Sequence, residues 1–262
     1  MSSNYWQNRM ARAQTALTNK NIRQIEKQIT KYYLSAMEQT IADFEAVYNK
    51  ILIQQSEGKE VTPALLYRLD AYWQAQAQLT QRLEKLRNRQ ARILSEAFQL
   101  QFFDVYYSIA IPGKEAFATI DADMAQQLIN QIWVLDGKSW SDRIWENTQQ
   151  LAATLNEELI HCVTTGKKTT DLKKRLQERF GVSYSRADAL VRTELAHIQT
   201  QAAKQRYEDY GIQYVEVLAD PDERRCDICG DLHQKRFPVD AQIPVPAHPR
   251  CRCCIVPVVE IE

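Results

Sequence analysis

Thiols and imidazoles are concentrated in one short stretch near the C-terminal end of the sequence. Five of the six cysteines and two of the four histidines lie between residues 226 and 254. Cys226 and Cys229 form a C-x-x-C pair, and His248 and Cys251 follow after a linker rich in proline. Thiolates combined with imidazole in a four-coordinate set select Zn²⁺. The spacing therefore predicts a zinc site made by Cys226, Cys229, His248 and Cys251.

The sequence does not decide which of two cysteines is the fourth ligand of this set. Cys253 competes with Cys251, because the two side chains would share a face in an extended strand. Cys254 would then point to the opposite, apolar side. His233 lies in the linker, and we expect it to be a surface residue and not a ligand.

We expect the zinc to be structural. A catalytic zinc keeps one position open beside a residue that acts on water, whereas this stretch has enough donors to close the shell. A segment of about 50 residues with few aliphatic side chains cannot offset its chain entropy by burial alone. A structural zinc, with roughly 10–16 kcal/mol of apparent binding free energy in small peptides, can fix its fold. The alternative is a set of unligated or disulfide-linked cysteines, which a reducing cytoplasm disfavours.

Two E-x-x-H sequences lie on predicted helices and raise a second kind of metal chemistry. They join Glu158 to His161 and Glu194 to His197. Di-iron carboxylate bundles use this spacing, but they also need an inward Glu from each of two further helices. The sequence places no such Glu clearly, so we interpret both motifs as chance occurrences.

Glu194 is nevertheless expected to be a partly buried carboxylate. It lies on the same side of its predicted helix as Val191 and Ile198. A buried carboxylate needs a cationic partner, which Arg192 or Arg206 could supply. The sequence therefore predicts a structural ion pair, with Arg192 and Glu194 as candidates.

Composition indicates a globular protein without membrane or bulk nucleic-acid affinity. Apolar residues make up 45% of the chain and charged residues 25%. There is no apolar run of 18 residues and no signal-type N-terminus, so we expect synthesis in a cytoplasm and no membrane partner. Lys plus Arg equals Asp plus Glu at 33 each, which leaves no global field for nucleic acid. The basic stretch 82–92 fits the solvated face of a helix.

The first half of the sequence predicts two long helices. Neither Gly nor Pro occurs before residue 58, and apolar residues recur every three or four positions. Residues 56–63 supply a turn, after which the apolar pattern restarts at Leu65. An antiparallel helical hairpin follows. The first apolar stripe consists of Ile25, Ile29, Tyr33, Met37, Ile41, Phe44, Tyr48 and Ile51.

The second half predicts shorter elements. A bend or extended piece is expected around Pro112 and Gly113, and a turn at Asp136 and Gly137. A helix capped by Ser141 should end near Gly166, a second should stop at Gly181, and a third should run from a cap at Ser185 to Gly211. Alternating apolar residues then predict strands near 212–220 and 254–261.

These elements predict a mainly α fold with a small α+β C-terminal module. The expected parts are a helical N-terminal region at 1–130 and a module at 131–262 that contains the metal-binding segment 220–258. Long helices with exposed aromatic residues suit docking on a partner, and they equally suit the core of a bundle.

The order of these pieces resembles the C-terminal module of phage head morphogenesis proteins of the Mu F type, or minor head proteins. The resemblance combines an R-T-E helix at 192–194, a strand after Gly211, a D-x-x-x-C-x-x-C turn at 222–229 and a terminal H-P-x-C-R-C at 248–253. It covers roughly residues 130 to 258. The usual ending is C-R-C, and the additional Cys254 of this sequence departs from it.

The resemblance implies a low-copy internal head protein that contacts the portal protein and other head proteins during assembly. It implies a role in DNA packaging or exit, possible contact with packaged DNA, and a location inside the virion after assembly in the host cytoplasm. It does not imply catalysis. Some relatives carry a toxin domain after this module, and none is expected here because the chain stops at Glu262.

Two other classes of function remain as alternatives. One is a metal-dependent enzyme, either a zinc hydrolase centred on the cysteine cluster or a di-metal bundle centred on the two E-x-x-H motifs. The other is a DNA-binding virion protein that uses the basic stretch 82–92 and the basic residues around Cys226.

Overall fold

Helices form most of the protein. A computed structural model describes residues 3–111, 113–115, 118–219 and 225–259, and in these ranges it contains seven helices and three strands. The chain divides into two compact units. The predicted fold class is confirmed: the protein is mainly α, with a small antiparallel sheet near its C-terminal end. The first unit consists of Met1–Ile25, Ile93–Trp140 and Ala189–Glu262, and the second of Glu26–Arg92 and Ser141–Asp188.

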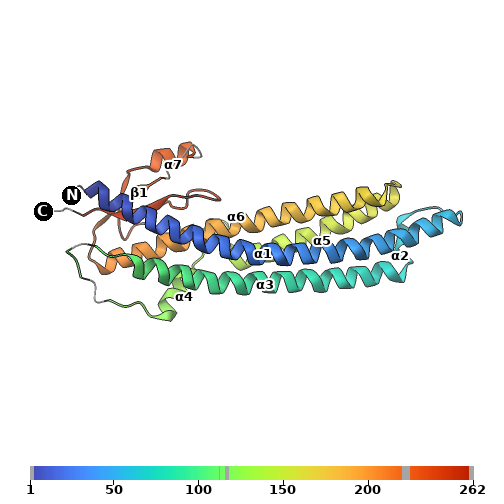
Figure 1. Cartoon of the computed structure of the whole chain (residues 1–262), viewed down its shortest axis with the longest axis horizontal. Helices are drawn as coiled ribbons and strands as arrows, with labels where there is room; N and C mark the ends of the chain where they lie inside the picture. Colours follow the sequence, from blue (N-terminus) through green and yellow to red (C-terminus); the bar gives the residue numbers. More distant parts are fainter. Residues whose placement is uncertain (1–2, 112, 116–117, 220–224, 260–262) are drawn as a thin grey trace. The chain divides into compact units, whose positions relative to one another are not determined.

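The second unit is a bundle of helical segments. Its segments belong to α1 (Ser3–Ser56), α2 (Pro63–Tyr67), α3 (Asp70–Ser108), α5 (Trp140–Thr164) and α6 (Thr169–Asp209). Helices α1 and α3 lie side by side and run in opposite directions (Figure 1), so the predicted helical hairpin is confirmed. An ion pair joins Arg82 on α3 to Asp43 on α1. The predicted apolar stripe on α1 is buried except at Met37, which is half-buried.

The second arm of the hairpin does not begin as one continuous helix, which corrects the prediction that the pattern restarts at Leu65. Thr62 caps the short α2, and its hydroxyl accepts a hydrogen bond from the Leu65 N–H at 3.3 Å. Pro63 occupies the first helical position, where its missing N–H is not needed. The chain then breaks at Arg68 and Leu69 before α3 begins.

Helix α6 runs without interruption through both predicted boundaries, so the stop at Gly181 and the cap at Ser185 are wrong. A glycine inside a helix costs only about 1 kcal/mol, which packing on either side offsets here. Phe180 is buried just before Gly181. Ser183, just after it, lies 3.2 Å from the hydroxyl of the buried Tyr33.

The other predicted helix ends are mostly confirmed. Helix α5 ends at Thr164, two residues before Gly166, and α6 ends at Asp209, two residues before Gly211. Gly211 has a φ of 69°, the left-handed conformation that favours glycine. The predicted cap at Ser141 is wrong, because α5 already begins at Trp140. Helix α3 extends to Ser108, and Pro112 lies outside the described residues.

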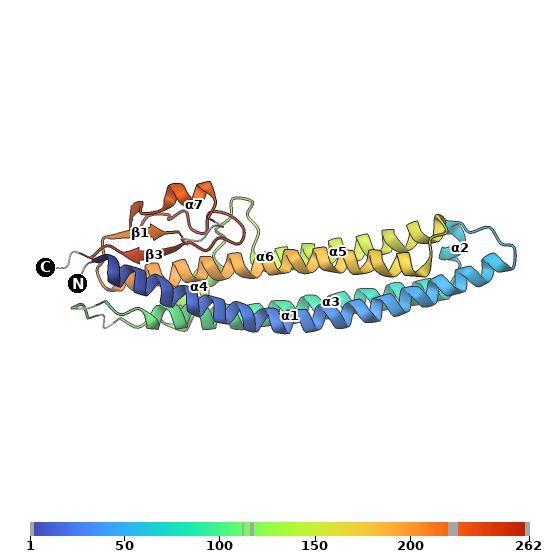
Figure 2. The ribbon, with the colours of Figure 1, turned by 45° about the horizontal axis from the view of Figure 1, so that its top comes forward.

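The first unit combines helical segments with the sheet. It contains α4 (Ala122–Asn130) and α7 (Asp227–Leu232), and the strands stand in the order β2-β1-β3. Both predicted strands exist and pair antiparallel, with Val217 opposite Ile255. Helices α4 and α7 and strand β2 were not predicted. Figure 2 shows α7 on one side of β1 and β3, and the N-terminal turns of α1 on the other. The strands are β1 (Tyr214–Leu218), β2 (Arg236–Pro238) and β3 (Cys254–Pro257).

The outer edge of β3 is covered by side chains of helices. The carbonyl groups of Ile255 and Pro257 point away from β1, since alternate residues of an antiparallel strand face its neighbour. The Tyr207 hydroxyl donates to the Ile255 carbonyl at 3.2 Å, and the Gln7 amide donates to the Pro257 carbonyl at 3.1 Å. Pro257 itself has no N–H.

The N-terminal part of α1 packs through a polar stripe, unlike the rest of that helix. Gln14, Thr18 and Asn21 are all buried in the first unit. They join Gln199 of α6 and Gln101 of α3 in one chain of hydrogen bonds with donor–acceptor distances from 2.5 to 3.3 Å. Directional bonds between three helices fix their alignment as well as their proximity.

Candidate metal centre

The C-x-x-C pair lies at the start of α7. Cys226 is the N-cap of this helix, with an extended backbone (φ −78°, ψ 165°), and its sulfur accepts a hydrogen bond from the Cys229 N–H at 3.4 Å. The Gly230 N–H donates to the Cys226 carbonyl at 2.9 Å. The turn therefore brings both sulfurs to one side, and backbone N–H groups offset their charge.

The other donors lie on the loop that leads into β3. The Cys251 N–H donates to the His248 carbonyl at 3.1 Å, which closes a tight turn. Arg250 inside this turn has a φ of 63°. Its N–H donates to the Thr193 hydroxyl of α6 at 3.0 Å, so the loop is anchored on the helix.

The structure brings the predicted donors together. The His248 Nε2 atom lies 3.2 Å from the Cys226 sulfur and 3.1 Å from the Cys229 sulfur, and the Cys229 and Cys251 sulfurs are 3.8 Å apart. Two sulfurs bound to one tetrahedral zinc at 2.3 Å are about 3.8 Å apart. The donor atoms fall into two groups that share Cys229, and within each group they lie within 4.8 Å of one another. This cluster can hold a metal ion.

Cys251 and Cys253 both lie in the cluster, and both are buried. A hydrogen bond from Cys253 lowers the pKa of the Cys251 thiol to about 5, despite opposing desolvation. The same bond, together with burial, raises the pKa of the Cys253 thiol above its ordinary value. Cys251 is thus the better thiolate of the two, and thiolates are the form that binds metals.

The other cysteine and histidine of this stretch, which were not predicted to be ligands, lie outside this cluster. Cys254 belongs to neither group of donor atoms among the described residues, and it opens β3 opposite Leu218. The His233 Nδ1 atom accepts a hydrogen bond from the Ala219 N–H at 3.2 Å. That bond assigns the ring proton to Nε2 and leaves His233 half-buried beside the sheet.

Glu158 of the first E-x-x-H motif forms a structural ion pair in the second unit. Its buried carboxylate accepts from Arg175 at 2.9 Å and from Arg179 at 2.9 and 2.5 Å. Burial acts to raise the pKa of Glu158, but the hydrogen bonds from the two arginines outweigh it and hold that pKa below its ordinary value. His161 is exposed on α5. The sequence missed both arginines because they lie on the next helix.

Glu194 and His197 of the second motif are buried in the first unit beside Trp133. The indole N–H donates to Glu194 at 3.1 Å, and the indole ring stacks on the His197 ring with centroids 4.4 Å apart. Burial lowers the pKa of His197 to about 4. Its Nε2 atom has no hydrogen-bond partner among the described residues. The ion pair of Glu194 with Arg192 stays a prediction.

The two E-x-x-H motifs belong to different units, and neither contributes to the possible metal-binding groups found among the described residues. Arg206, the other candidate partner of Glu194, lies over the rings of Tyr106 and Tyr210 at 4.8 and 4.7 Å. The geometry therefore favours the cysteine cluster over a di-metal bundle as the metal centre.

Comparison with known proteins places the cluster inside a family match. The family model described as Phage Mu protein F like protein matches residues 153–256, which include all the predicted metal ligands. No curated protein and no solved structure matches the chain. In the part of the chain that the structure describes, no helix has the length and apolar character needed to cross a bilayer.

Proposed function

We propose that the chain is a portal-associated minor head protein of the capsid interior. The proposal starts from the Mu F-like region at residues 153–256, which supports a phage head-related protein. In this role it joins the portal and other head proteins during assembly in the host cytoplasm and acts in DNA packaging or ejection. The observation that carries the proposal is the family match, which spans the whole sulfur and imidazole cluster.

The cluster is proposed to hold one structural zinc. The ligands are Cys226, Cys229, His248 and Cys251, with Cys253 as the alternative fourth ligand. Three of the donor pairs support this set, because His248 lies 3.2 and 3.1 Å from the sulfurs of Cys226 and Cys229, and the Cys229 and Cys251 sulfurs are 3.8 Å apart. Bound zinc would join α7 to the loop before β3. A closed set of four protein ligands supports a structural ion and not an enzyme.

Exposed apolar side chains on the hairpin support docking on a protein partner. Tyr67 and Trp73 keep 44% and 56% of their surface exposed, and the Trp73 indole donates to the Tyr67 carbonyl at 2.9 Å. The ordered ring of Tyr72 lies 5.1 Å from that of Trp73. Rigid, exposed aromatic rings are frequent anchors of protein interfaces. We assign docking to the helical region 1–130 and metal stabilisation to the module 131–262.

Packaged DNA is a further proposed partner. Arg82, Lys85 and Arg89 line a groove of about 400 Å³ between α1 and α3 in the second unit. Arg82 is neutralised by Asp43, and Arg89 lies over the Tyr32 ring at 4.6 Å. If this groove contacts DNA, retention on a DNA column should fall steeply as the salt concentration rises. Retention that is absent at low salt would remove DNA from the proposal.

The decisive experiment is co-expression of the full chain with the portal protein of the same genome. We expect the two proteins to co-purify, and Trp73→Ala to weaken the complex about tenfold. Trp145→Ala is the matched control, because Trp145 is 46% exposed and belongs to the other assigned region. Failure of the unmodified chain to associate with the portal would refute the docking role.

The proposed location has its own test. Purified particles should contain the protein, and it should resist added protease until the heads are opened. Digestion in intact particles would contradict an internal position.

A further inference from the structure

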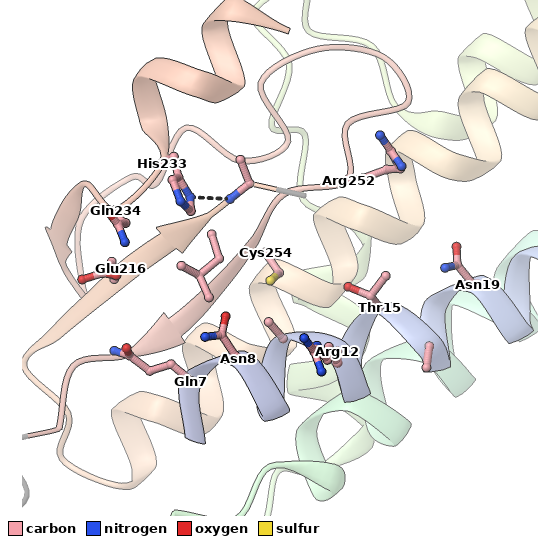
Figure 3. Close-up of a pocket in the computed structure, with 14 residues that line it drawn as sticks. Gln7, Asn8, Arg12, Thr15, Asn19, Glu216, His233, Gln234, Arg252 and Cys254 are labelled. Carbon is pink, nitrogen blue, oxygen red and sulfur yellow. Dashed lines mark hydrogen bonds between the residues drawn. The ribbon is translucent and has the colours of Figure 1, made fainter. Parts of the chain in front are cut away.

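A groove of about 660 Å³ lies in the first unit between α1 and the sheet. Asn8, Arg12, Thr15 and Asn19 form its helical side, at spacings of four, three and four residues that place them on one face of α1. Figure 3 shows these side chains opposite β1 and the start of β3. The groove is thus elongated along the helix, and the metal centre is not part of it.

The sheet side of the groove is mixed. Leu218, Ala219 and Cys254 give it an apolar floor. Polar groups stand at its ends: Figure 3 shows Glu216 toward one end and Arg252 toward the other. An occupant therefore needs small or apolar groups against the floor and polar groups along the helical side.

The charges along the groove favour an anionic occupant. The exposed Arg12 guanidinium makes no hydrogen bond or ion pair to any described residue. Among the described residues of the lining, the one carboxylate is Glu216, which is already paired with Arg236 at 3.2 Å. The Nδ1 atom of His233 is held as an acceptor by the Ala219 N–H, so its Nε2 keeps a proton that it can donate.

The uncharged groups indicate a peptide instead of a nucleic acid. Asn8, Asn19 and Gln234 each carry one acceptor and two donors, which match the C=O and N–H of a peptide group. A phosphodiester offers only acceptors. None of the described residues that line the groove is Phe, Tyr or Trp, whereas sites for single-stranded nucleic acid stack bases on such rings.

We propose that this groove binds an extended segment of a partner protein that carries Asp or Glu side chains. The segment lies along α1, with its backbone on the amide side chains and a carboxylate on Arg12. The inference does not depend on the identity of the metal or on binding to the portal.

The test uses the full chain and a fluorescein-labelled octapeptide of alternating Glu and Ala, followed by fluorescence anisotropy. We expect saturable binding that weakens about tenfold in Arg12→Glu, because the variant replaces an attraction by a repulsion. Arg23→Glu is the matched control, since Arg23 is exposed on the same helix and does not line the groove. It should bind like the unmodified chain.

A second pair of variants tests the location without changing charge. Ala16 lines the groove and Ala13 does not, although both are exposed on α1. Ala16→Trp should block the octapeptide, whereas Ala13→Trp should not, with unchanged helix content by circular dichroism in both. Equal binding by both variants, or no binding of the octapeptide at millimolar concentration, would overturn the proposal. Tighter binding of a single-stranded DNA oligonucleotide that Arg12→Glu also weakens would overturn the choice of a peptide.

Discussion

The sulfur of Cys229 and the Nε2 atom of His248 lie 3.1 Å apart, although 19 residues separate them in the chain. One side chain is fixed by the first turn of α7 and the other by the loop before β3. An ion bound between them would join two segments that the backbone alone connects only through a long linker. The first two predictions concern this connection.

Removal of the metal should destabilise the first unit. We expect one zinc per purified chain, and EDTA should lower the unfolding midpoint because the ion binds only the folded cluster. Most helical signal should survive at room temperature, since the second unit has a separate core. Circular dichroism and elemental analysis before and after chelation measure both effects. An unchanged midpoint in the metal-free protein would contradict a structural ion.

Single cysteine variants should identify the fourth ligand. Cys251→Ser should lose the metal, because the 3.8 Å contact with the Cys229 sulfur fits direct coordination. Cys253→Ser should keep it with reduced affinity. Cys162→Ser is the control, since that cysteine is buried in α5 of the second unit. Metal content per chain gives the result, and the reverse order of Cys251 and Cys253 would assign the ligand to Cys253.

Glu158→Gln should lower the free energy of unfolding by roughly 2 kcal/mol at pH 7, since it removes charged hydrogen bonds from two arginines. The pKa of Glu158 is lowered in the folded protein, so its contribution is complete above its unfolded pKa of about 4.3. The contribution is lost as the pH falls through the folded pKa. Urea unfolding of both proteins should therefore converge in acid. Glu157→Gln, exposed on the same helix, should change little at any pH.

His197→Phe should reduce the sensitivity of the first unit to acid. The pKa of His197 is about 4 in the folded protein because of burial, against about 6.5 when unfolded. Unfolding therefore takes up a proton between these values, and stability falls as the pH drops from 6.5 to 4, by roughly 3 kcal/mol. Phe keeps the stack on Trp133 and cannot be protonated. Urea unfolding between pH 7 and 4 measures the difference, and His161→Gln at an exposed site should retain the full dependence.

Gly181→Ala and Gly211→Ala should have opposite effects. Gly181 lies inside α6, and a Cβ there would meet nothing within 4 Å, so Ala should stabilise the helix by about 0.5–1 kcal/mol. Gly211 has a φ of 69°, where a Cβ is strained, so Ala should destabilise by roughly 1–2 kcal/mol. Urea midpoints of the two variants provide the comparison. Destabilisation by Gly181→Ala would show that α6 is interrupted there.

Local chemistry predicted the long helices of the hairpin, helix α5 and the strands β1 and β3. The absence of Gly and Pro up to residue 57 gave α1, and alternating apolar residues gave β1 and β3. Errors arose where packing outweighed a local signal. Gly181 and Ser185 are typical of a helix end, but the buried residues on either side of Gly181 keep α6 continuous. Strand β2 was not predicted, because a segment of three residues is too short to show a periodic pattern of apolar residues.

In the candidate sites, too, the sequence predicted the local motifs but not the partners that only the fold brings close. Cysteine spacing identified the residues of the cluster, because a C-x-x-C turn and an H-x-x-C turn are each local structures. The partners of Glu158 could not be predicted, since Arg175 and Arg179 lie on another helix that only the fold brings close. The stack of Trp133 on His197 is likewise a product of tertiary packing.

The hydrogen bonds from Tyr207 and Gln7 to the backbone of β3 affect how the protein associates at high concentration. A strand with free carbonyls recruits a strand from a neighbouring molecule, and the addition can repeat without limit. Here both outward carbonyls are occupied, and Pro257 offers no N–H to an incoming chain. The β3 edge of the small sheet therefore offers no free outward carbonyl to an added strand, which hinders copies of the protein at high local concentration from pairing along this edge.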